Sequence, residues 1–214
     1  MVNVLDKVQP KNKKQLKQLI DYAFKHNIYD LNFIDTSEIT DMSNLFMNCE
    51  CDIDVSNWDV SNVTNMSAMF YYCKNFDCDL SNWDVSNVTN TAGMFYYCKN
   101  FDCGLSSWDV SNVTCMEYMF TGCEKFNCDL SNWDVSKVTD MRHMFRLCKK
   151  FDCDLSNWNV SNVKDMYSMF TACENFKGKG LENWDVSKVK DMNYMFNNCD
   201  KASIPSWYKL YHRK

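Results

Sequence analysis

The stretch DVSNWDVSNVTNMSAMFYYCKNFDC, residues 54–78, is followed at 79–103 by DLSNWDVSNVTNTAGMFYYCKNFDC, and this near-repetition decides the fold. The same text recurs along the chain with a step of 25 residues, and of 26 residues at the last step. The tryptophan of each unit marks that step: Trp58, Trp83, Trp108, Trp133, Trp158 and Trp184. A period of about 20 to 50 residues indicates a stacked array, because so small a unit cannot bury its apolar face alone.

The apolar residues within one unit change their spacing halfway along it. From Val63 to Cys73 they recur at steps of three and four, which is the pattern of one face of a short helix. From Phe76 to Leu80 apolar and polar residues alternate, which predicts a short half-buried strand. We therefore predict an α/β fold, a leucine-rich-repeat-like right-handed solenoid of short parallel strands and short helices. A propeller blade of about 40 to 45 residues is too long for this period.

Both ends of the chain depart from the repeat. Residues 12–26, NKKQLKQLIDYAFKH, place apolar side chains on one face of a helix, which predicts an N-terminal capping helix. We expect Ile204, Trp207 and Leu210 to close the last unit, and Gly178 to mark a bulged strand. The predicted domains are an N-terminal cap at 1–33, a repeat solenoid of about six units at 34–200 and a C-terminal cap at 201–214.

The 13 cysteines follow the repeat as well. One column stands three residues after the phenylalanine of each unit: Cys49, Cys73, Cys98, Cys123, Cys148, Cys173 and Cys199. A second column contains Cys78, Cys103, Cys128 and Cys153. We interpret both columns as reduced core residues, because the spacing lacks the close ligand pairs of a zinc site and a thiol packs as a small hydrophobe. Cys115 stands in an otherwise polar column, and we expect it to be exposed and reactive.

The unit at residues 76–98, FDCDLSNWDVSNVTNTAGMFYYC, resembles the repeat of the BspA-like leucine-rich-repeat surface proteins of bacteria. The shared pattern is Leu-Ser-x-Trp-x-Val-Ser-x-Val-Thr, then Met-Phe-x-x-Cys, and it covers about residues 34–200. The resemblance implies a surface-exposed or secreted protein that acts in adhesion or host interaction.

The composition excludes several other classes of function. A net charge of −5 argues against direct nucleic-acid binding, whose usual mark is a basic patch. The 5 glycines form no phosphate-binding loop, and the 3 histidines, His26, His143 and His212, stand near no nucleophile motif. We therefore expect no enzyme activity, no cofactor and no metal. The N-terminus lacks the apolar region of a signal peptide, which favours the cytoplasm, and no apolar run reaches the length of a membrane span.

Two surfaces are candidates for binding a partner. The outward positions of the predicted helices are rich in tyrosine and arginine, the residue types that dominate interface hot spots. This helix face contains Tyr71, Tyr72, Tyr96, Tyr97, Tyr118, Arg142, His143, Arg146 and Tyr167. The outward positions of the predicted strands are acidic and could steer a basic partner. This strand face contains Asp77, Asp79, Asp102, Asp129, Asp152 and Asp154, followed by Lys177 and Lys179.

These patterns predict a non-enzymatic protein–protein interaction module with a protein partner. The resemblance favours bacterial adhesion or host interaction. An alternative is an intracellular inhibitor or immunity-type protein that blocks an enzyme, such as a nuclease, through its acidic or Tyr/Arg surface. A further class is a structural module that self-associates through its ends.

Overall fold

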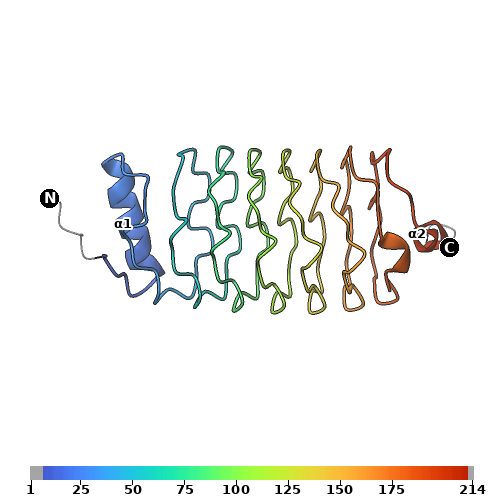
Figure 1. Cartoon of the computed structure of the whole chain (residues 1–214), viewed down its shortest axis with the longest axis horizontal. Helices are drawn as coiled ribbons and strands as arrows, with labels where there is room; N and C mark the ends of the chain where they lie inside the picture. The colour runs from blue at the N-terminus through green and yellow to red at the C-terminus, as the bar shows by residue number, and fades with distance from the viewer. Residues whose placement is uncertain (1–6, 212–214) are drawn as a thin grey trace.

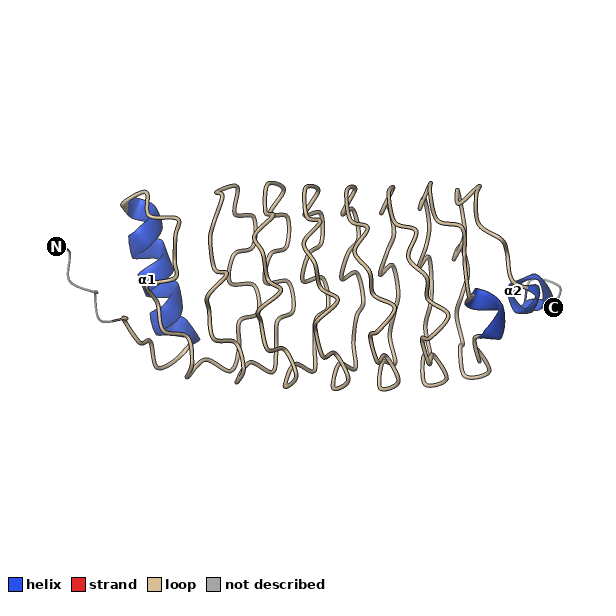
Figure 2. Cartoon of the chain, in the orientation of Figure 1, coloured by secondary structure: helices blue, strands red, loops and turns tan. Residues whose placement is uncertain are grey.

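The computed structural model describes residues 7–211 as a row of stacked coils with a helix at each end (Figure 1). The helices are α1 (Lys13–Lys25), a short 3-10 helix η1 (Leu181–Asn183) and α2 (Ser206–Tyr211). All the remaining described chain consists of turns and loops, and no extended strand occurs within 7–211 (Figure 2). The predicted caps also include residues 1–6 and 212–214, with His212, which lie outside the described residues.

The predicted short helix in each unit is a pair of successive turns. In the unit at residues 54–78, the Met69 N–H donates to the Met66 carbonyl at 3.2 Å, and the Cys73 N–H donates to the Phe70 carbonyl at 3.0 Å. The third residue of each turn, Ala68 or Tyr72, has a positive φ of 53° or 60°. That sign at the third position belongs to a type II turn, and it cannot occur within an α-helix of L-residues.

Hydrogen bonds between coils replace those of a helix. The N–H groups of Met66, Ala68, Phe70 and Tyr72 donate to carbonyls of the following coil at 2.7 to 2.9 Å. Only isolated parallel bridges result, one between each pair of successive coils along the column Asp41, Asn65, Asn90, Cys115, Asp140, Asp165 and Asp191. These donors therefore all point toward the C-terminal end of the row.

The predicted short strand at Phe76–Leu80 has no backbone ladder either. Aspartate side chains accept hydrogen bonds there: the Asp102 N–H donates to Asp77 Oδ1 at 3.2 Å, and the Lys177 N–H donates to Asp152 Oδ1 at 2.9 Å. Aspartate competes for backbone donors in this way, and it thereby removes the pairing that defines a strand. The predicted α/β leucine-rich-repeat-like right-handed solenoid of short parallel strands and helices is therefore wrong. Gly178 is a loop residue with a φ of 72°, directly before the turn at Lys179 and Gly180, rather than part of a bulged strand.

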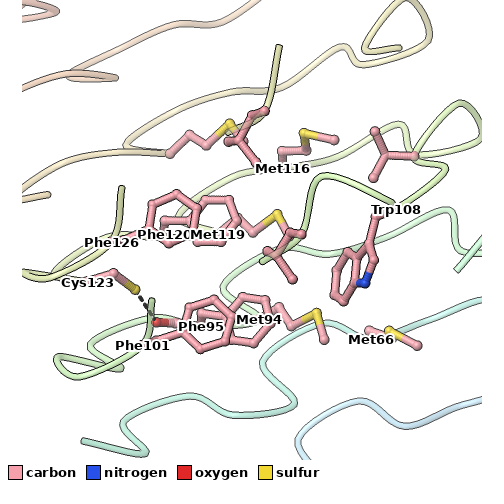
Figure 3. Close-up of a cluster of buried hydrophobic side chains, with 14 of the residues drawn as sticks. Met66, Met94, Phe95, Phe101, Trp108, Met116, Met119, Phe120, Cys123 and Phe126 are labelled. Carbon is pink, nitrogen blue, oxygen red and sulfur yellow. Dashed lines mark hydrogen bonds between the residues drawn. The ribbon is translucent and has the colours of Figure 1, made fainter. Parts of the chain in front are cut away.

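Stacked aromatic columns fill the interior of the coils. Figure 3 shows Phe95 beside Phe101 in one layer and Phe120 beside Phe126 in the next. The Phe95 and Phe120 ring centroids are 5.7 Å apart with the planes 6° from parallel, and all four rings are fully buried. Apolar burial of this kind is the main favourable term in folding, so each coil depends on its neighbours for stability.

Each end of the row is covered by a helix. Asn12 caps α1 by accepting the Gln15 N–H at 3.0 Å, and α1 buries Leu16, Ile20 and Ala23 against the core. At the other end, Ile204, just before α2, and Trp207, within α2, pack on the core. Leu210, which was expected to join them, is 58% exposed.

Candidate protein-binding surface

The tyrosines of neighbouring coils stack on one another. The Tyr71 and Tyr96 ring centroids are 4.4 Å apart with the planes 5° from parallel, and those of Tyr72 and Tyr97 are 5.0 Å apart at 10°. All four side chains are half-buried. The rings are therefore held in place before any partner binds, while part of each side chain still faces solvent.

The row of rings continues beyond these tyrosines. Tyr118 meets Tyr96 edge to face at 6.0 Å and stacks on His143 at 4.5 Å. His143 meets Tyr167 at 5.1 Å, and Tyr167 meets Tyr194 at 5.7 Å. We name as the tyrosine face the residues Tyr71, Tyr72, Tyr96, Tyr97, Tyr118, His143, Tyr167 and Tyr194. Sequence reasoning missed Tyr194, which is 58% exposed, although it occupies the same repeat position as Tyr118.

The two positive-φ positions of each unit present many of these side chains. Tyr72, Tyr97, Tyr118, His143 and Tyr194 all have φ between 55° and 60°. Glycines occupy the same repeat positions at Gly93 and Gly122. A Cβ at Gly122 would lie 2.9 Å from Cγ of Tyr97, so this glycine makes room for the ring.

One hollow of about 440 Å³ lies among the tyrosines. Small residues account for it, because Gly93 stands where other coils carry Tyr118, His143 or Tyr194. Its lining residues are Ala68, Tyr71, Ala92, Gly93, Tyr96, Glu117 and Tyr118. Burial and the adjacent Tyr71 raise the pKa of Tyr96 to about 12, and burial with the Glu117 charge raises the pKa of Tyr118, so both rings are neutral phenols at neutral pH.

An ionic cluster adjoins this hollow. Arg142 donates to Glu117 Oε2 at 2.7 Å and to Asp140 Oδ2 at 2.8 Å, and its Nε lies 3.8 Å from Asp165 Oδ2. Burial and the Asp140 charge raise the pKa of Glu117, and burial also raises the pKa of Asp165. The structure thus engages Arg142, one of the predicted binding residues, in intramolecular ion pairs, although its side chain is still 39% exposed. Arg146 is half-buried beside Tyr118 and His143.

Three potential metal ligands also meet at this cluster, a feature that sequence reasoning missed. One ligand atom each of Cys115, Glu117 and Asp140 lies within 4.8 Å of the others. Arg142 already hydrogen-bonds to both carboxylates, so a cation occupies that position. Burial raises the pKa of the Cys115 thiol, which opposes metal binding through a thiolate. The expected exposure of Cys115 is also wrong, because its side chain is half-buried.

The aspartates of the predicted strand face lie in turns instead. Asp79, Asp129 and Asp154 each accept the N–H of the serine two residues later at 2.9 to 3.0 Å, which lowers the pKa of each carboxyl. Asp77 and Asp102 accept N–H groups of the next coil. Lys177 pairs with Asp152, and Lys179 pairs with Asp154 and holds its pKa at about 2. Most of these carboxylates therefore bind the chain itself.

Most cysteines of the two columns are buried, whereas Cys49, Cys78 and Cys103 are half-buried against the core. The Cys98 thiol donates to the Phe70 carbonyl at 2.9 Å, and the Cys123 thiol donates to the Phe95 carbonyl at 3.0 Å, as the dashed line in Figure 3 shows. All 13 cysteines are free thiols. Burial raises the pKa of Cys98, Cys123 and Cys173 well above that of an exposed thiol, so they are protonated at neutral pH.

The two described histidines, His26 and His143, lie in different parts of the fold. Burial and the neighbouring Arg146 and Arg142 charges lower the pKa of His143 to about 4, so its ring is neutral at pH 7. Its Nδ1 is buried without a hydrogen-bond partner. His26 is the C-cap residue of α1, and its Nδ1 lies 2.8 Å from the Tyr22 carbonyl.

The helices of the described chain are all too short or too polar to cross a lipid bilayer. A search of curated proteins and a search of solved structures return no match to the chain. The resemblance to BspA-like proteins is therefore not confirmed. One family model matches residues 14–120 and again residues 102–207, as expected for a repeat protein. Because these matches span most of its length, the chain belongs to the family described as Mycoplasma protein of unknown function, DUF285.

Proposed function

We propose that this protein is a non-enzymatic recognition module that binds another protein through the tyrosine face. One observation carries the proposal, namely the continuous row of half-exposed rings that crosses successive coils from Tyr71 to Tyr194. Tyrosine supplies much of the energy of protein interfaces. Rings that are already stacked lose little conformational freedom on binding, so more of their contact energy remains as affinity.

The chemistry of the surface supports binding rather than catalysis. A nucleophile needs a neighbouring base or a lowered pKa. Burial instead raises the pKa of the half-buried thiols Cys103 and Cys115, and His143 is neutral and lacks a hydrogen-bond partner at Nδ1. The residue types of the surface also recur from coil to coil, which suits an extended contact better than a single reaction centre.

We infer adhesion or host recognition rather than charge-based enzyme inhibition as the role, because the candidate acidic residues already bind groups of the chain itself. Inhibition of a nuclease would depend on free acidic groups. Asp77, Asp79 and Asp102 accept backbone hydrogen bonds, and Lys177 pairs with Asp152. The aromatic rings have no such intramolecular role beyond their own stacking.

The test compares two variants of the purified, reduced protein. The first replaces Tyr72, Tyr97 and Arg146 with serine, a residue type that adopts a positive φ of 54° at Ser168, in the other turn of a coil. The control replaces Asp79, Asp129 and Asp154 with asparagine, which keeps the oxygen that accepts the serine N–H. Each immobilised protein is offered cell lysate and, separately, host surface extract, and the retained proteins are identified by mass spectrometry.

We expect the wild type and the aspartate variant to retain the same host surface protein. The tyrosine variant should lose that protein while its melting temperature stays near that of the wild type. If the tyrosine variant retained the partner protein and the aspartate variant lost it, binding would be assigned to the acidic turns instead. A single intracellular enzyme that is retained only at low salt would support the inhibitor alternative. Concentration-dependent mass with no retained partner would indicate a self-associating structural module.

A further inference from the structure

We propose that the hollow between Tyr71, Tyr96 and Tyr118 is a pocket for the guanidinium group of an arginine on the partner protein. This inference rests on the proposed function, because it assigns a specific contact to the tyrosine face. It is carried by the shape of the hollow, by the position of the rings around it and by the charge of the carboxylates next to it.

The rings provide π-faces at an angle to one another. Tyr71 and Tyr96 lie 5° from parallel, whereas the Tyr118 ring is turned 73° from that of Tyr96 at a centroid distance of 6.0 Å. A cation within about 6 Å of such a ring is attracted by its quadrupole. A planar guanidinium can also stack on a tyrosine, which the compact ammonium of lysine does not do.

Space for the group comes from Gly93. At this repeat position the next two coils carry Tyr118 and His143. A Cβ at Gly93 would lie 3.5 Å from Cδ2 of Tyr71, so any larger side chain at this position would extend into the hollow. The hollow of about 440 Å³ is thus open because this one coil lacks a side chain there.

The neighbouring carboxylates leave negative charge to be balanced. Glu117, Asp140 and Asp165 surround the single guanidinium of Arg142. Arg142 occupies Oε2 of Glu117, and within the described chain no group donates to Oε1. Glu117 also lines the hollow, so a second guanidinium can bind this carboxylate from the other side. Arg142 therefore already shows the interaction that a partner arginine would repeat.

The experiment is an NMR titration of the ¹⁵N-labelled protein with N-acetyl-arginine amide. N-acetyl-citrulline amide is the control ligand, because it has nearly the same shape and no charge. We expect saturable shifts of the Gly93 and Tyr118 amide signals with the arginine probe and none with the citrulline probe. Equal shifts with both probes would overturn the proposal, and tighter binding of N-acetyl-lysine amide would overturn its assignment to a guanidinium.

Three variants make the result specific to the hollow. Gly93→Tyr fills it with the residue that Tyr118 and Tyr194 supply at the same position and φ, so the variant is expected to fold and to lose the shifts. Glu117→Gln should weaken the probe about threefold or more, through loss of the charged hydrogen bond. Tyr194→Ser, at the far end of the tyrosine face, should leave the titration unchanged. Unchanged shifts in Gly93→Tyr would refute the pocket.

The two experiments distinguish failure of the arginine pocket from failure of the tyrosine face as the interface. If the arginine probe binds as expected but the Tyr72, Tyr97 and Arg146 variant still retains the partner protein, the pocket stands and the wider tyrosine face is not the interface. If the partner is lost in that variant but the probe does not bind the wild type, the tyrosine face functions without an arginine pocket.

Discussion

Trp207 donates a hydrogen bond from its indole Nε1 to the backbone carbonyl of Leu181 at 2.9 Å. Trp184 makes the same bond to Leu155 at 3.2 Å, and the two indole rings are 6.5 Å apart and 11° from parallel. The C-terminal segment thus continues the tryptophan column of the coils although its sequence no longer follows the repeat. It covers the apolar end of the row with Trp207, which contacts the last coil as the tryptophan of a further coil would.

Removal of this ring should weaken the C-terminal end. We expect Trp207→Ala to lower the free energy of unfolding by about 2 to 3 kcal/mol, less than for a fully buried tryptophan because Trp207 is partly exposed. Urea titration measures the change. Leu210→Ala is the matched control and should cost less than about 0.5 kcal/mol, because Leu210 is 58% exposed. Equal effects in both variants would show that the tryptophan contact does not stabilise the cap.

Two glycines should respond oppositely to alanine. Gly122→Ala places a Cβ 2.9 Å from Cγ of Tyr97 at a φ of 74°, and we expect a loss of about 2 to 3 kcal/mol in the free energy of unfolding. Gly104→Ala meets no atom within 4 Å, and it should be neutral or slightly stabilising. Thermal melts of both variants test the prediction. A neutral Gly122→Ala would show that the Tyr97 ring is free to move away.

His143 should make the protein sensitive to mild acid. Burial, Arg146 and Arg142 lower its pKa from 6.5 to about 4, and Asp140 only partly opposes them, so the unfolded chain binds the proton first. Stability is therefore lost as the pH falls from about 6.5 toward 4, by about 1 kcal/mol after allowance for solvent screening. His143→Asn, which suits the φ of 55°, should flatten this part of the pH profile in urea titrations.

The wild type and His143→Asn are compared so that contributions shared by both proteins cancel. Protonation of Glu117 and Asp165, whose pKa values are raised, stabilises the folded state of both proteins as the pH falls. Tyr118 and Tyr167 also contact the His143 ring, so the variant is expected to be less stable at every pH. Parallel profiles for the two proteins would contradict the assignment to His143.

The buried cysteines of the two columns should resist alkylation. Because a thiolate is the reactive form, and burial raises the pKa of Cys98, Cys123 and Cys173, we expect these thiols to remain unmodified by iodoacetamide at pH 8. Mass spectrometry of the digested protein locates the modified residues. The half-buried thiols Cys49, Cys51, Cys78, Cys103 and Cys115 should react before the buried ones, and all 13 cysteines should react in denaturant. Early modification of Cys123 would indicate that the coils open locally.

The sequence by itself determined that the units stack. The step from Trp83 to Trp108 fixes which residues meet between coils, because every residue faces its equivalent in the next unit. Burial of the tryptophan and phenylalanine columns, and of most of the cysteines, follows from that register. The helix α1 (Lys13–Lys25) is also readable, since its apolar spacing and its Asn12 cap are local features.

The tertiary structure decided how each coil is built. Apolar residues at steps of three and four suit an α-helix, but two successive turns place Met66, Met69 and Phe70 inward equally well. The difference is the sign of φ at Ala68 and Tyr72, and neither residue type signals a positive φ. Elsewhere in these columns the sequence does contain the signal, as residues that favour positive φ: Asn44, Asn48, Gly93, Gly122 and Asn198.

The candidate pocket depended on the tertiary structure for a different reason. Tyr71, Gly93 and Glu117 belong to three different coils, and none of them is unusual within its own unit. Stacking brings them together, and the hollow arises because one coil has glycine where its neighbour has Tyr118. The sequence determines which residues meet, whereas the turn geometry of each coil determines which side chains face solvent and what shape they enclose.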